Sequence, residues 1–192
     1  MTAPPTTARR FVLLDRDGTI NEEVDHLDDP DDLVLISGSA AAIRRLREIG
    51  LGVVVVTNQA QIGRGLLSEE RLVAIHERLA ALLAEEGAEV DDILHCPHPP
   101  EHACDCRKPA PGMALEAAAR FGFDPGRAFV VGDHAGDAGL GRAVGATTFL
   151  VLTGHGVEEL ARTDGEGLAD HVVSDLAAAA DIITSLVDEE AE

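Results

Sequence analysis

The chain has 192 residues, 45% of them hydrophobic, and a formal net charge of −20 at pH 7. The length suits one domain with a full core, and the hydrophobic content excludes an intrinsically disordered chain. The charge argues against nucleic acid or an anionic membrane as a partner, and no apolar run approaches the roughly 20 residues that a transmembrane helix needs.

Residues 1–10 are polar and rich in Pro and Thr, without the apolar segment of a signal peptide. We expect them to form a flexible N-terminal tail, followed by a single domain over residues 11–188. All three Cys lie between positions 96 and 106, unlike the disulfide framework of a secreted protein. These features predict a cytoplasmic protein.

Strands and helices are expected to alternate along the chain. Continuously apolar, β-branched runs predict parallel core strands at residues 11–14, 51–56, 128–131 and 147–151, with a short strand at 93–94. Amphipathic segments predict helices at residues 39–49, 68–86, 111–121, 136–144, 156–162 and 175–187. Ser68 suits the start of its helix, Gly87 the end, and Pro111 a first turn. The alternation predicts a doubly wound α/β fold with a mainly parallel sheet and helices on both faces.

The first strand ends abruptly at two acids, Asp15 and Asp17, and Gly18 then permits a sharp turn. Ligand sites in open α/β sheets lie beyond the carboxyl ends of the strands. Two carboxylates held so close repel each other unless a positive charge lies between them. Mg²⁺, which prefers oxygen ligands, is the natural candidate, and a solvated acidic turn is the alternative.

The ends of two further strands also carry polar residues. Thr57 follows the second strand, where its hydroxyl and the next backbone N–H groups can donate to a phosphate, although an ordinary turn fits as well. Asp133 follows the third strand and can complete a Mg²⁺ site with Asp15. Asp137 begins a helix, where it either orients the site or caps the helix.

Lys108 is the only Lys in a chain whose other 14 strong cations are Arg. Its retention suggests a role for a compact ammonium that the planar guanidinium of Arg cannot fill, and chance retention on the surface is the alternative.

Cys96, His98, Cys104 and Cys106 offer three thiolates and one imidazole, a set that suits tetrahedral Zn²⁺. Four protein ligands close the coordination sphere, so the zinc is expected to be structural, stiffening this loop and orienting Arg107 and Lys108. His95 and His102 are alternative ligands, and three free thiols are the alternative to a metal site.

Four short motifs follow one another along the chain. They are Asp15-x-Asp17-Gly18-Thr19, then Thr57, then Lys108, and then Gly132-Asp133-x-x-x-Asp137. This set resembles the motifs of the haloacid dehalogenase (HAD) superfamily of phosphohydrolases, and it implies a HAD-like Rossmannoid domain. The short spacers between the motifs leave no room for a large cap domain. The loops at residues 21–36, 59–67 and 96–108 are therefore expected to shape the pocket.

The resemblance also implies a phosphatase mechanism. The phosphoryl group passes to Asp15 and forms an aspartyl-phosphate. Mg²⁺ is held by the carboxylates of Asp15 and Asp133 and by the backbone carbonyl of Asp17. Asp17 protonates the leaving oxygen and then activates water, while Thr57 and Lys108 hold the phosphate oxygens.

Within the superfamily, one subgroup is the most similar. The shared segments are Asp15–Asn21, Thr57-Asn58-Gln59, Gly63-Arg64-Gly65 and the Cys-rich loop that ends in Arg107-Lys108-Pro109. They resemble the D-glycero-D-manno-heptose 1,7-bisphosphate 7-phosphatases and the histidinol-phosphate phosphatases. This resemblance implies a small phosphorylated sugar or amino alcohol as substrate, with Asn58, Arg64 and Arg107 as contacts, and a monomer.

The chain departs from the subgroup at Ala60-Gln61, where Ser-Gly is common, and at His134, where Lys is common. Both positions lie on the substrate side, with His134 beside Asp133. Removal of the 7-phosphate from heptose 1,7-bisphosphate is the leading hypothesis, and hydrolysis of histidinol phosphate is the first alternative. A catalytically silent, zinc-stabilised binding protein is a third hypothesis, which the presence of both Asp15 and Asp17 disfavours.

Overall fold

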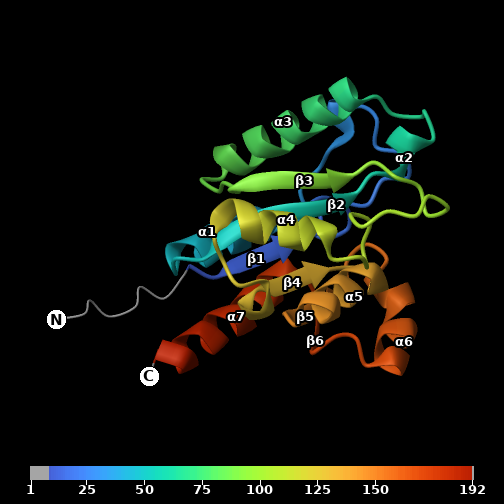
Figure 1. The fold of residues 1–192 in the computed structure, drawn as a ribbon. Helices are drawn as coiled ribbons and strands as arrows, with labels where there is room; N and C mark the ends of the chain where they lie inside the picture. The colour runs from blue at the N-terminus through green and yellow to red at the C-terminus, as the bar shows by residue number, and fades with distance from the viewer. Residues whose placement is uncertain (1–8, 192) are drawn as a thin grey trace.

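Six strands form one parallel sheet at the centre of the protein, which a computed structural model describes over residues 9–191 (Figure 1). The order β3-β2-β1-β4-β5-β6 places the first strand inside the sheet, with later strands added on both sides. The strands are β1 (Phe11–Leu14), β2 (Gly52–Asn58), β3 (Asp92–Cys96), β4 (Phe129–Gly132), β5 (Thr147–Val151) and β6 (His171–Val173). The predicted doubly wound fold is confirmed.

The helices connect these strands and cover both faces of the sheet (Figure 1). They are α1 (Ser39–Glu48), α2 (Ala60–Gly63), α3 (Glu69–Glu85), α4 (Gly112–Phe121), α5 (Ala135–Val144), α6 (Gly156–Glu166) and α7 (Leu176–Ala191). Two short 3₁₀ turns, η1 (Pro30–Asp32) and η2 (Pro125–Arg127), lie in the connections.

The continuously apolar strand β1 is buried on both faces because it serves two cores. Val12 and Leu14 belong to one hydrophobic cluster, together with buried residues of α1, α3 and α7. Phe11 and Leu13 belong to the other, together with buried residues of α4 and α5. Alternate side chains of a strand point to opposite faces, so a strand covered by helices on both sides must be apolar at every position.

Most predicted elements are confirmed, with ends that shift by one to a few residues. Ser68 caps α3 by accepting a hydrogen bond from Arg71 N, whereas Pro111 lies just before α4 rather than inside it. The strand β6 and the single turn α2 were not predicted. Each is only three or four residues long, which is too short to show a periodic pattern.

The expected tail includes two residues that contact the domain. Arg9 Nη2 donates to the carbonyl of Leu51 at 2.8 Å, and Arg10 Nε donates to that of Arg127 at 2.9 Å. The rest of the expected tail, residues 1–8, lies outside the described residues.

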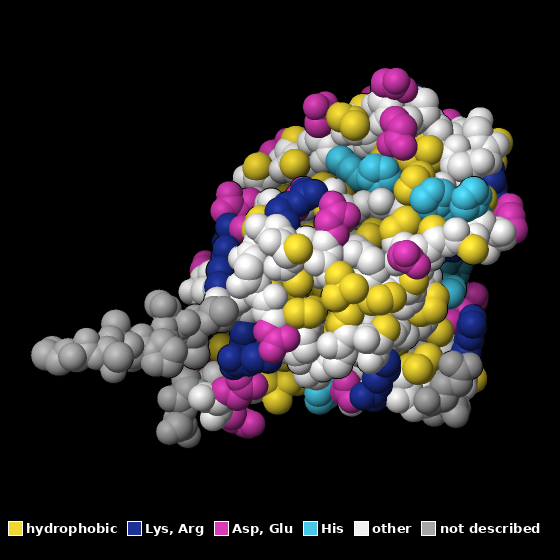
Figure 2. All heavy atoms as spheres, in the orientation of Figure 1, with side chains coloured by type: hydrophobic (Ala, Val, Ile, Leu, Met, Phe, Trp, Pro, Cys, Tyr) yellow, Lys and Arg dark blue, Asp and Glu magenta, His cyan; other side chains and the backbone are white. Residues whose placement is uncertain are grey.

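Asp and Glu side chains are scattered among Arg side chains over the face shown in Figure 2 and do not gather in one patch there. Among residues 9–191, none of the helices combines the length and the apolar character needed to cross a membrane.

Candidate active site

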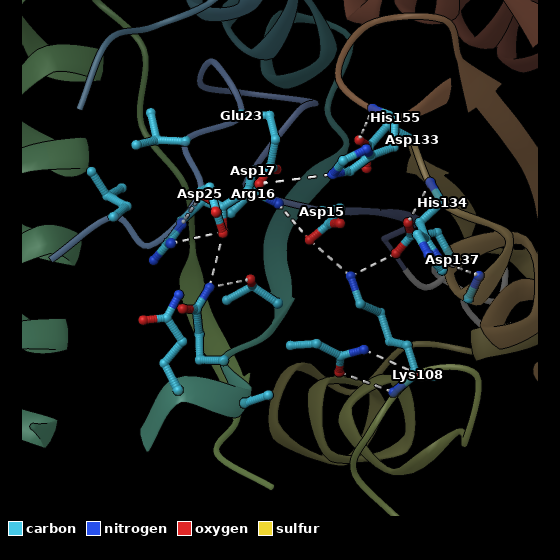
Figure 3. A pocket seen from close by; sticks show the side chains of 18 of the residues that line it. Asp15, Arg16, Asp17, Glu23, Asp25, Lys108, Asp133, His134, Asp137 and His155 are labelled. Carbon is cyan, nitrogen blue, oxygen red and sulfur yellow. Dashed lines mark hydrogen bonds and ion pairs between the residues drawn. The ribbon is translucent and has the colours of Figure 1, made fainter. Parts of the chain in front are cut away.

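A pocket of about 430 Å³ lies beyond the carboxyl ends of β1, β2 and β4. Because these three strands are neighbours in the sheet, the residues that follow them meet at one edge. Asp15, Thr57 and Asp133 line the pocket from these strand ends, and Lys108 reaches it from the Cys-rich loop. The structure therefore brings the four predicted motifs together (Figure 3).

Lys108 lies at the base of the pocket, and its side chain is almost fully buried. Its Nζ is 2.8 Å from Oδ1 of Asp15 and 2.6 Å from Oδ1 of Asp137, and it donates to the carbonyl of Val56 at 2.7 Å (Figure 3). Burial alone would lower the pKa of Lys108, but the charges of Asp137 and Asp15 outweigh it and raise that pKa. Three acceptors thus match the three N–H donors of one ammonium.

Asp133 faces Asp15 from the neighbouring strand. Burial and the nearby carboxylates raise the pKa of Asp133 to about 8 and that of Asp15 to about 7. Carboxylate oxygens of Asp15, Asp133 and Asp137 lie within 4.8 Å of one another. A divalent cation between these oxygens would remove the repulsion that raises the pKa values, so the donor set fits Mg²⁺. Both oxygens of Asp137 are engaged, Oδ1 by Lys108 and Oδ2 by His134 N. The contacts of Asp15 with Lys108 and Arg16 N both fall on Oδ1, and that of Asp133 with His155 N falls on Oδ2, so each of these two carboxylates can offer its other oxygen to a metal.

The backbone packs closely around Asp133. A Cβ atom at Gly18 or at Gly154 would lie 2.2 Å from Asp133 Oδ2, closer than any packing allows. The same oxygen accepts a hydrogen bond from His155 N at 2.8 Å. Two glycines and one backbone donor therefore fix the orientation of this carboxylate.

Asp17 is held by its neighbours on both carboxylate oxygens. Arg16 donates to Oδ1 at 3.0 Å and to Oδ2 at 2.7 Å, Asn21 donates to Oδ1 at 3.0 Å, and Gln59 donates to Oδ2 at 3.0 Å. Burial alone would raise the pKa of Asp17, but the Arg16 charge and these hydrogen bonds lower it. Asp15 and Asp17, two residues apart, therefore have pKa values shifted in opposite directions.

Thr57 and Asn58 follow β2 but make different contacts. Thr57 Oγ1 accepts a hydrogen bond from Gln59 Nε2 at 2.9 Å, which leaves its own proton free to be donated. The side-chain amide of Asn58 bonds the backbone of Lys108 at both ends, accepting from N at 3.1 Å and donating to O at 3.2 Å. Asn58, a predicted substrate contact, therefore holds Lys108 in place while lining the pocket.

His134 and Asp137 form a reciprocal cap at the start of α5. His134 Nδ1 accepts a hydrogen bond from Gly136 N, and Asp137 accepts one from His134 N, both at 3.1 Å. Asp137 thus caps the helix and also pairs with Lys108, so the two roles that the sequence left open coexist. Burial lowers the pKa of His134, and Nδ1 must be unprotonated to accept its bond.

The rim of the pocket carries opposite charges from different loops. Arg64 follows α2, and Arg107 is fixed by donating from Nη1 to the carbonyl of His98 at 3.2 Å. Glu23 and His155 also line the pocket, with 4.0 Å between Glu23 Oε1 and His155 Nε2. The expected contributions of the loops at residues 21–36, 59–67 and 96–108 are confirmed, but the loop after β5 that carries His155 was not foreseen.

Arg16 and Gln59 are not among the predicted site residues, although both line the pocket and both donate hydrogen bonds to Asp17. The sequence shows Arg16 between Asp15 and Asp17, but it does not show which of the two carboxylates pairs with the guanidinium.

Cys96, His98, Cys104 and Cys106 converge, each offering a ligand atom within 4.8 Å of the others. His98 Nδ1 is 3.2 Å from Cys106 Sγ, and Cys96 Sγ is 3.7 Å from Cys104 Sγ. The alternative ligands lie outside the cluster: His95 pairs with Glu69, and the ring of His102 stacks on that of His98. Three sulfurs and one ring nitrogen at this spacing can hold a tetrahedral Zn²⁺.

Comparisons with known proteins agree with this geometry. A family model described as HAD-hydrolase-like matches residues 105–179. The D-glycero-beta-D-manno-heptose-1,7-bisphosphate 7-phosphatase of Pseudomonas aeruginosa is 42% identical over 174 residues, which cover 90% of this chain and 97% of that protein. The enzyme of the same name from Bordetella bronchiseptica is 39% identical over 173 residues, 90% of this chain and 96% of that protein.

Two solved structures extend the comparison. The D,D-heptose 1,7-bisphosphate phosphatase of B. bronchiseptica, complexed with magnesium and phosphate, has a TM-score of 0.85 at 38% identity and covers 92% of this chain and 98% of that one. The enzyme of the same name from Burkholderia thailandensis has a TM-score of 0.71 at 36% identity, with 92% and 99% covered. The chain therefore belongs to the HAD-like hydrolases, in the family of the heptose 1,7-bisphosphate 7-phosphatases.

Proposed function

We propose that this protein is a Mg²⁺-dependent phosphatase that removes the 7-phosphate from D-glycero-D-manno-heptose 1,7-bisphosphate. The observation that carries the proposal is the Asp15 carboxylate at the base of the pocket, paired with Lys108 and facing Asp133. The relatives from P. aeruginosa and B. bronchiseptica are named for this substrate, and their similarity to this chain supports the choice of sugar.

Asp15 is the proposed nucleophile. Its carboxylate attacks the phosphorus, the bond to the sugar oxygen breaks, and an aspartyl-phosphate forms. Lys108 offsets negative charge beside Asp15, and the free hydroxyl proton of Thr57 is available to a phosphate oxygen. Mg²⁺, held by Asp15 and Asp133, would supply charge neutralisation at the phosphate.

Asp17 handles the proton in both halves of the reaction. Its carboxyl gives a proton to the departing sugar oxygen, and its carboxylate then takes one from water. That water attacks the aspartyl-phosphate, releases inorganic phosphate and regenerates Asp15. The Asp17 side chain is partly exposed to the pocket, whereas Arg16 beside it is buried. The contacts that lower the pKa of Asp17 favour the carboxylate that the second half of the reaction needs, and in the first half the negative charge of the bound phosphate opposes that lowering and favours the protonated carboxyl.

Arg64 and Arg107 are the proposed contacts for the remaining anionic part of the substrate. His134 also lines the pocket, where its backbone N–H donates to Asp137. We infer that the enzyme acts in the cytoplasm as a monomer on a small phosphorylated sugar, without nucleic acid or membrane as a partner. Gel filtration with light scattering tests the monomer.

The decisive test is phosphate release by the purified protein with Mg²⁺, comparing heptose 1,7-bisphosphate with histidinol phosphate. We expect a strong preference for the bisphosphate and no turnover by Asp15→Asn. A preference for histidinol phosphate would replace the substrate and keep the chemistry. Activity of Asp15→Asn equal to the wild type would refute the assignment of the nucleophile.

A further inference from the structure

Arg16 contacts both reactive carboxylates of the site at once. Its backbone N–H donates to Asp15 Oδ1 at 2.7 Å, while its side chain pairs with Asp17 (Figure 3). The backbone carbonyl of Arg16 in turn accepts from the N–H groups of Ile20 and Asn21, at 2.8 and 3.2 Å. The residue is therefore fixed at both its main chain and its side chain.

The pairing of Arg16 with Asp17 is a two-point contact. Nε donates to Oδ1 at 3.0 Å and Nη2 donates to Oδ2 at 2.7 Å, so two donors of one guanidinium engage the two oxygens of one carboxylate. Only 1% of the Arg16 side chain is exposed, whereas 22% of the Asp17 side chain is exposed. The guanidinium thus supports the carboxylate from behind and leaves it open to the pocket.

Two further donors complete the arrangement. Asn21, which is fully buried, bonds Oδ1, and Gln59, which is nearly so, bonds Oδ2. Each oxygen of Asp17 therefore accepts two hydrogen bonds, and rotation of the carboxylate would break several of them together. A buried ion pair is weak evidence for a gain in stability, because desolvation offsets the Coulomb attraction. The contact between Arg16 and Asp17 is therefore better explained by the orientation that it gives the Asp17 carboxylate than by a gain in stability.

We propose that Arg16 is a positioning residue for Asp17, whose carboxyl it aligns for proton transfer to the leaving oxygen of the substrate. This role rests on the proposed function, in which Asp17 protonates that oxygen. Lys at this position would keep the positive charge but lose the two parallel N–H donors. The geometry of the contact, rather than its charge, is what the proposal requires.

The test exploits the leaving group. An alkyl phosphate such as heptose 1,7-bisphosphate needs a proton on the departing oxygen, whereas 4-nitrophenyl phosphate releases a stable phenolate without one. The value of kcat/KM reports the steps through phosphoryl transfer to Asp15. For Arg16→Lys we expect kcat/KM to fall on the order of 100-fold with the alkyl phosphate and only about threefold with the aryl phosphate.

A second variant pair asks whether Arg16 acts through Asp17. In an Asp17→Asn background, adding Arg16→Lys should lower kcat/KM for the alkyl phosphate by less than about twofold. In this background the buried cation at position 16 lacks its carboxylate whether it is Arg or Lys, so that cost is common to both proteins and cancels from the comparison. Arg44→Lys, an exposed exchange of the same kind on α1, is the matched control.

The outcomes separate the two proposals. Equal losses with both substrates, no loss with either, or a full further loss in the Asp17→Asn background would each overturn the role of Arg16 and leave the phosphatase intact. Failure of the wild type to release phosphate from both substrates would overturn the proposed function and, with it, this role.

Discussion

The Nζ atom of Lys108 lies 2.8 Å from Oδ1 of Asp15, in a position that water barely reaches. Asp137 shares the same ammonium at 2.6 Å. One buried cation therefore offsets the repulsion between two carboxylates, so we expect its loss to affect both the stability of the fold and the chemistry of the pocket.

Replacement of Lys108 by Met should destabilise the fold and remove activity together. Loss of one partner from a buried ion pair costs about 3–5 kcal/mol, because the remaining charges stay buried without compensation. Denaturant unfolding gives the stability change, and phosphate release gives the activity. Lys108→Arg should also be impaired, since a planar guanidinium cannot meet the three acceptors around Nζ; near-normal turnover by this variant would contradict the argument.

Gly154→Ala should weaken Mg²⁺ binding by displacing Asp133. A Cβ at this position would lie 2.2 Å from Asp133 Oδ2, and the residue has a φ of +54°. Gly122→Ala is the matched control, because Gly122 also has a positive φ, +70°, but a Cβ there meets nothing within 4 Å.

Both variants carry the cost of an Ala in the left-handed region, roughly 1 kcal/mol. Gly154→Ala should lose more stability than Gly122→Ala, because its Cβ would also lie 2.6 Å from the backbone Cα of Gly18. Only Gly154→Ala should require more Mg²⁺ for half-maximal activity. The same Mg²⁺ dependence in both variants would show that the contact with Asp133 does not matter.

The protein without Mg²⁺ should lose stability as the pH rises through neutrality. Burial and carboxylate repulsion raise the pKa of Asp15 to about 7 and of Asp133 to about 8, above the ordinary value of 3.8 that applies on unfolding. Between the unfolded-state pKa of 3.8 and these raised pKa values, the folded state binds more protons than the unfolded state. The free energy of unfolding therefore falls as the pH rises.

Mg²⁺ requires both carboxylates to be ionised, so its affinity should rise over the same range. Thermal unfolding from about pH 6 to about pH 9, with and without Mg²⁺, measures both effects. Asp133→Asn should flatten the dependence without metal; an unchanged slope in that variant would contradict the assignment.

Cys104→Ser should lower stability more than it alters the chemistry. The four ligand atoms lie in the loop that carries Arg107 and Lys108, outside the cluster of Asp15 and Asp133. Metal analysis of the wild type should give about one zinc per chain, and strong chelation should lower the thermal midpoint. A wild-type protein without zinc would exclude the structural metal.

The sequence alone predicts the fold and the composition of the site because both follow from local patterns. The apolar run at residues 11–14 is continuous because β1 is covered on both faces, and the acids after it mark the carboxyl end of a strand. The metal site of the Cys-rich loop can be predicted from sequence because its four ligands lie within one short segment, residues 96–106. A strand of three residues, β6, lacks such a pattern and escapes prediction.

What only the tertiary structure decided is which of these side chains meet. Asn58 bonds the backbone of Lys108, 50 positions away, and Gln59 joins Thr57 to Asp17, 42 positions from Gln59. Arg16 lies between two acids in the sequence, yet its backbone faces one and its guanidinium pairs with the other. The periodicity of apolar residues in the sequence indicates which face of a strand or helix a residue occupies. Which side chains pair depends on the order of the strands in the sheet, because that order brings distant segments of the chain together.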